Sequence, residues 1–101
     1  MDTLELVKKL VNRDERADID ALIIIFEYPD GVELKAVYED EGEPGDDDYE
    51  LTTSYHIKGQ NWLLEVIVSN NTEWELDYVE NENNALKWLM TPPLPIKIGY
   101  K

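Results

Sequence analysis

The chain has 101 residues, which is enough for one domain with a modest hydrophobic core. Its 23 acidic residues against nine basic ones give a net charge of −14, which disfavours direct binding to nucleic acids and to anionic membrane surfaces. The absence of cysteine excludes disulfides, thiolate metal sites and cysteine nucleophiles. Neither a secretory signal nor an apolar run long enough to cross a bilayer is visible, so we expect a cytoplasmic protein.

The first half of the chain predicts a helix followed by a β-hairpin. Residues 3–12 have apolar side chains near helical spacing, and Thr3 is expected to cap the start of this helix. Residues 19–28, IDALIIIFEY, are apolar on both faces and predict a strand that is covered on both sides near the centre of its sheet. The turn residues 29–31, Pro-Asp-Gly, then lead into residues 32–39, where apolar and polar side chains alternate.

The second half predicts a loop and then more strands. Residues 40–48, DEGEPGDDD, are expected to form an exposed loop because proline, glycine and carboxylates disfavour regular structure. Alternation in residues 73–79 favours a strand with Trp74, Leu76 and Tyr78 directed inward, and a helix is the alternative there. The further predicted elements are strands at 49–57 and 62–69, a helix at 82–90 and a short edge strand within 94–100.

This order of elements predicts an α+β fold in a single domain. We expect a mainly antiparallel, twisted sheet of about five to six strands, because the connections are short and hairpin neighbours are the default. The N-terminal helix and the short C-terminal helix are expected to pack on one face of that sheet.

The charge is concentrated in one segment. Between Ala21 and Ile57 there are eleven acidic side chains and one basic side chain, Lys35. A solvent-exposed sheet face or loop normally carries both acidic and basic side chains. Clustered charges of one sign destabilise the folded state because they repel one another. The segment therefore predicts a surface that receives a basic partner protein. The candidate partner-binding residues in this segment are Glu33, Glu39, Asp40, Glu41, Glu43, Asp46, Asp47, Asp48 and Glu50, and the outward residues of the predicted strand 73–79, namely Glu73, Glu75 and Asp77, extend the surface.

The sequence shows no catalytic constellation, so we expect a non-enzymatic protein without cofactors. His56 lacks a cysteine or serine–aspartate context, and the glycines are isolated, which excludes a glycine-rich phosphate loop. A calcium module built on the acidic loop is one alternative, because hard cations take oxygen ligands. The EF-hand register fails, however: if Asp46 is the first position, Leu51 stands where glycine is required and Ile57 where glutamate is required.

In charge and size, the chain resembles the DNA-mimic inhibitors with which phages block restriction or CRISPR nucleases. The resemblance implies a partner that is a nuclease or another nucleic-acid-binding protein, and a surface whose carboxylates stand in for phosphates. An immunity protein or antitoxin that neutralises a basic toxin is the other binding class that the charge fits. General acidity from adaptation to high salt is a further alternative, against which the concentration of charge in one segment argues.

Overall fold

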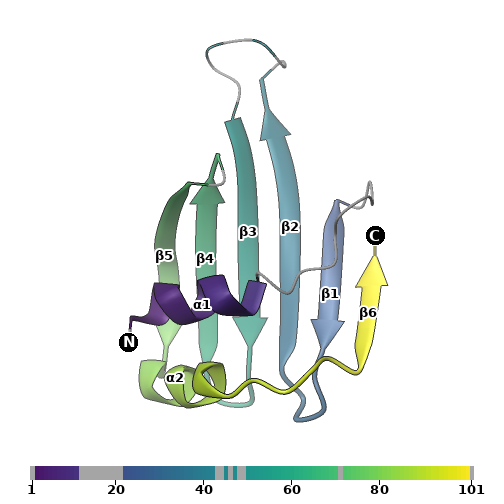
Figure 1. The fold of residues 1–101 in the computed structure, drawn as a ribbon, viewed down its shortest axis with the longest axis vertical. Helices are drawn as coiled ribbons and strands as arrows, with labels where there is room; N and C mark the ends of the chain where they lie inside the picture. The colour runs from purple at the N-terminus through teal and green to yellow at the C-terminus, as the bar shows by residue number, and fades with distance from the viewer. Residues whose placement is uncertain are drawn as a thin grey trace.

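The computed structural model describes residues 2–11, 22–42, 45, 47, 50–70 and 72–100, with only the backbone of Glu41. In chain order the elements are α1 (Thr3–Val11), β1 (Ile23–Glu27), β2 (Glu33–Glu41), β3 (Glu50–Lys58), β4 (Leu63–Ser69), β5 (Glu73–Glu80), α2 (Glu82–Met90) and β6 (Lys97–Tyr100). The strands form one sheet in the order β5-β4-β3-β2-β1-β6 (Figure 1). All neighbouring strands are antiparallel. The predicted α+β fold is therefore confirmed.

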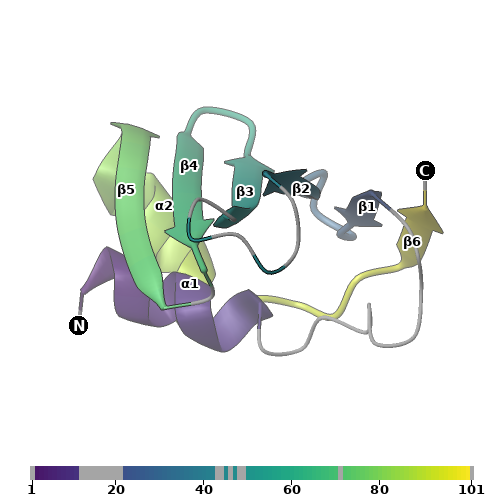
Figure 2. The same ribbon diagram turned by 90° about the horizontal axis from the view of Figure 1, so that it is seen from above.

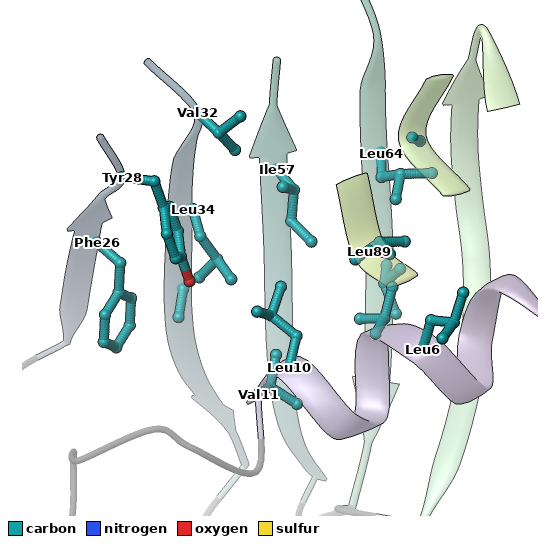
Figure 3. Close-up of a cluster of buried hydrophobic side chains, with 14 of the residues drawn as sticks. Leu6, Leu10, Val11, Phe26, Tyr28, Val32, Leu34, Ile57, Leu64 and Leu89 are labelled. Carbon is teal, nitrogen blue, oxygen red and sulfur yellow. The ribbon is translucent and has the colours of Figure 1, made fainter. Parts of the chain in front are cut away.

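Both helices lie on the same face of the sheet (Figure 2). They contact each other, α2 packs on β4 and α1 packs on β5. In Figure 3, Leu10 of α1 and Leu89 of α2 lie over the sheet residues Ile57 and Leu64, all of which are buried. The core is thus a single layer of apolar side chains between the sheet and the helix pair, and burying it is the main stabilising contribution to the fold.

The helix pair is joined by a hydrogen bond that the sequence did not predict. Thr3 lies within α1 and is itself buried, and its hydroxyl donates to Glu82 Oε2 of α2 over 3.0 Å. The prediction that Thr3 caps α1 is wrong, because this residue already belongs to the helix and its hydroxyl serves the contact between the two helices.

The prediction for β1 is wrong in two respects. β1 is not central, because β6 alone separates it from the edge of the sheet. It is also not covered on both sides: Ile24 and Phe26 are buried, whereas Ile23 and Ile25 are only half-buried and lie on the face without helices. The reason is that both helices pack against the opposite face. Residues 19–21 of the predicted strand lie outside the described residues.

The prediction for β5 is correct in type but wrong at Tyr78. The register shifts between Glu65 and Val66 of β4, so that Leu76 pairs with Val66 while Tyr78 pairs with Glu65. Asp77 is the extra residue of this bulge. The bulge reverses the alternation, so Tyr78 is exposed and Val79 packs against the core in its place.

Two boundaries also differ from those predicted. β2 continues through Asp40 and Glu41, which were expected in the loop, because these residues pair with Leu51 and Glu50 of β3. β6 begins at Lys97, after residues 91–96 have crossed from α2 to the sheet edge (Figure 1). The helix predicted at 82–90 and the hairpin of β1 with β2 are confirmed.

An aromatic cluster ties α2 to the β1–β2 turn. The Trp88 ring contacts Tyr28 edge-on with centroids 4.9 Å apart, and its Nε1–H donates to Asp30 Oδ2 over 2.7 Å. We expect Asp30→Ala to lower the free energy of unfolding by about 1–2 kcal/mol, because the indole loses a charge-assisted hydrogen bond. Asp30→Asn keeps one carbonyl oxygen and should lose less. Urea denaturation measures both, and equal losses in the two variants would contradict this assignment.

Candidate acidic interface on the open face of the sheet

The face of the sheet opposite the helices, here called the open face, can be mapped from the strand register. On β2, the side chains of Leu34, Ala36 and Tyr38 are buried on the face that the helices cover. Successive side chains of a strand point to opposite faces, so the residues between them belong to the open face: Glu33, Lys35, Val37 and Glu39. Residues directly opposite each other in neighbouring strands share a face. The open face of β3 therefore comprises Glu50, Thr52, Ser54, His56 and Lys58.

The acids of this face gather at one end of the sheet. We call it the distal end: it is the end at which β2 passes into the connection to β3, at the top of Figure 1. A row of paired residues crosses the strands there from Glu39 through Thr52 and Ser69 to Glu73. On β3, Glu50 is the next residue of the same face after Thr52, farther toward the distal end. On β5, Glu75 is the next residue of the same face after Glu73, farther from the distal end.

The spacing of these carboxylates suits a polyanion-like surface. β2 and β5 are three strand spacings apart, so Glu39 and Glu73 are separated by about 14 Å across the sheet. Hydroxyl side chains of Thr52 and Ser69 lie between them. In B-DNA, two negatively charged backbones flank a major groove about 12 Å wide. The distal end thus presents two acidic margins at a similar separation.

No lysine that the structure describes lies on the distal part of the open face. Lys8 extends over the Trp74 ring, 5.5 Å from its centroid, on the helix-covered face. The other described lysines are Lys9 on α1, Lys87 on α2, and Lys35, Lys58 and Lys97 toward the opposite end of the sheet. Within the described residues, the lysines of the open face thus lie away from its distal end, and none of them is a direct neighbour of the distal acids.

The opposite end of the open face mixes charges. Glu33 lies between Glu27 of β1 and Lys58 of β3, and Glu27 in turn faces Lys97. This places Glu33, one of the predicted partner-binding residues, in a mixed environment away from the distal acids.

His56 contributes a contact that the sequence did not predict. It lies opposite Glu65, and its Nε2 is 3.3 Å from Glu65 Oε1. This contact follows from the pairing of β3 with β4, which neither strand's sequence shows alone.

The remaining predicted residues divide into three groups. Asp40 and Asp47 are exposed, but Asp40 follows the alternation of Tyr38 and so belongs to the helix side of β2, beyond the helices. Asp77 is exposed at the bulge of the edge strand β5. Glu43, Asp46 and Asp48 lie outside the described residues, as does the side chain of Glu41, whose backbone pairs with Glu50.

Other kinds of site find little support in the described part of the chain. No group of three or more His, Asp or Glu side chains there is arranged to hold a metal ion. The calcium loop stays a prediction, because several of its carboxylates are outside the described residues. An apolar pocket of about 370 Å³ on the helix side is lined by Tyr28, Tyr55, Pro93 and other uncharged residues, so it is separate from the acidic interface.

Among the described helices, none combines the length and the apolar character needed to span a bilayer. Comparisons with protein-family models, with curated proteins and with solved structures found no match to this chain.

Proposed function

We propose that the protein is a non-enzymatic inhibitor whose acidic surface occupies the nucleic-acid-binding site of a basic partner, in the manner of a DNA mimic. The observation that carries this proposal is the distal end of the open face, where Glu39, Glu50, Glu73 and Glu75 lie together and no described lysine of that face lies beside them. Exposed Asp40 and Asp47 add to the charge of the same end.

Electrostatic attraction between the acidic surface and a basic binding site would drive the binding of the partner. Nucleic-acid-binding sites are lined by lysine and arginine, which attract a surface that carries clustered negative charge. Attraction between such surfaces accelerates association and weakens as salt screens it. In the free protein the same carboxylates repel one another, so docking against cations relieves that repulsion.

The test is a competition between the protein and duplex DNA. The tagged protein is incubated with a lysate of its source organism at about 50 mM and about 500 mM salt, and retained proteins are identified by mass spectrometry. We expect a basic, DNA-binding partner that is retained at low salt only and is released by a 30-base-pair duplex oligonucleotide. A partner that DNA fails to displace would contradict the proposal, as would the retention of no protein.

A further inference from the structure

The open face carries a strip of aliphatic side chains beside its acidic end. The strip consists of four half-buried β-branched residues from three strands, namely Ile23 and Ile25 of β1, Val37 of β2 and Ile67 of β4. The solvent face of an antiparallel sheet is normally polar, because only its other face packs on the core. These four side chains therefore call for an explanation other than packing against the helices.

The register shows that the strip crosses the sheet, interrupted on β3 by Ser54, and that it meets the acids. Ile23 pairs with Val37, Val37 with Ser54, and Ser54 with Ile67, which places these residues in one line across β1, β2, β3 and β4. Ile67 pairs in turn with Glu75 of the distal end. On the other side of the line, the next row begins at Ile25, which pairs with Lys35, and continues to the His56–Glu65 pair. The aliphatic line is thus bordered by rows that contain charged side chains on both sides, and Ile25 extends the strip into the second of these rows.

This pattern is the one that protein interfaces show. Their centres are apolar and depleted of charge, while their rims are polar and charged. The size is also suitable: six strands at about 4.8 Å spacing and strands of seven residues, as in β4, give a face of roughly 29 Å by 23 Å. The area of this face is therefore roughly 670 Å². In a standard interface each partner contributes about 800 Å², which is similar.

We propose that the open face as a whole is the docking surface for the basic partner, with the strip of Ile23, Ile25, Val37 and Ile67 as its dehydrated centre. This inference rests on the proposed function. The distal carboxylates steer and orient the partner, and the strip holds it once water has left the interface. The partner that fits has lysines and arginines bordering an apolar patch. A second copy of this chain fits poorly, because each copy carries a net charge of −14.

Site-specific photo-cross-linking locates the docking surface. Benzoyl-phenylalanine replaces Ser54, between Val37 and Ile67, in one sample and Met90 in the other. Met90 is 70% exposed on α2 and serves as the control on the helix side. We expect the Ser54 probe to cross-link to the protein that duplex DNA displaces, and the Met90 probe not to do so. Cross-linking from Met90 alone, or of a second copy from Ser54, would overturn the inference.

Binding measurements test the strip itself. The double variant Val37→Thr with Ile67→Thr keeps β-branched side chains suited to a strand but adds hydroxyls to the centre of the interface. We expect its Kd for the purified partner to rise at least tenfold, on the order expected for interface hot spots, and by a similar factor at each salt concentration at which binding is measurable. Met90→Thr should leave Kd unchanged, and thermal unfolding confirms that both variants are folded.

The two proposals fail in different ways. If duplex DNA displaces the partner but the Ser54 probe gives no cross-link, or the double threonine variant binds normally, the acidic-inhibitor function stands and the open face is not its docking surface. If DNA displaces no partner, the proposed function is wrong and the docking inference falls with it.

Discussion

Reversal of the four distal acids Glu39, Glu50, Glu73 and Glu75 to lysine is expected to weaken partner binding by at least about 100-fold. The reversal converts attraction to a basic groove into repulsion, so the association rate should fall most and its dependence on salt should disappear. All four side chains are on the surface layer of the sheet and none belongs to the core, so we expect the fold to survive. Surface plasmon resonance at several salt concentrations measures the effect.

A matched control separates position from total charge. Reversing Asp2 and Glu5 to lysine takes the net charge from −14 to −10, and so does reversing only Glu39 and Glu73, since each reversal changes the charge by two units. Asp2 precedes α1 and Glu5 lies on it, so neither residue belongs to the open face. We expect the Asp2/Glu5 variant to lose less than about tenfold in affinity, from reduced long-range attraction, and the Glu39/Glu73 variant to lose more. Equal losses in the two sets would show that net charge, and not the distal end, determines binding.

Gly59→Ala is expected to be the most destabilising of the single substitutions considered, lowering the free energy of unfolding by about 2–4 kcal/mol. Gly59 lies in the β3–β4 turn, where its N–H donates to the Trp62 carbonyl over 2.9 Å. A Cβ at this position would overlap the indole ring of Trp62. That ring is buried and packs against Trp88 with centroids 5.6 Å apart, so it cannot move without opening the aromatic cluster.

Gly99→Ala provides the control for this prediction. Gly99 lies in β6, and a Cβ there would meet no heavy atom within 4 Å. We expect a change within about 0.5 kcal/mol, because a strand tolerates alanine where space is open. Thermal and urea denaturation measure the free energy of unfolding of both variants. The difference between them separates the steric overlap at Gly59 from the general effect of replacing glycine with alanine. A Gly59→Ala variant as stable as Gly99→Ala would mean that the turn adjusts and that the Trp62 contact is not rigid.

The sequence was sufficient for the elements whose pattern is local. The Pro-Asp-Gly turn between two apolar runs specified the hairpin of β1 and β2, because proline and glycine impose the backbone angles of a turn. Helical spacing of Leu6, Val7 and Leu10 specified α1 and its buried face. Alternation specified most of β5, up to the bulge at Asp77, whose position depends on pairing with Glu65 and Val66 and so cannot be deduced from one strand alone.

The candidate site was only partly predictable. The sequence identified an acid-rich segment, but alternation alone could not show that Glu33 lies beside Lys58 while Glu39 and Glu73 share a row with Thr52 and Ser69. Those neighbours come from different strands, and strand order and register decide them. The apolar outer face of β1 predicts burial within the protein, whereas in the structure it is only half-buried and lies on the face without helices.

By itself, the amino-acid sequence determined the charge of this protein, the approximate positions of its helices and strands, the buried face of α1 and the inward side of β5 up to its bulge, because these depend on composition and on periodicity along the chain. Only the tertiary structure decided that both helices take the same face, that Glu39, Glu50, Glu73 and Glu75 meet at one end of the other face, and that an aliphatic strip lies beside them. Those arrangements depend on contacts between segments distant in the sequence, and no local pattern encodes which segments will become neighbours.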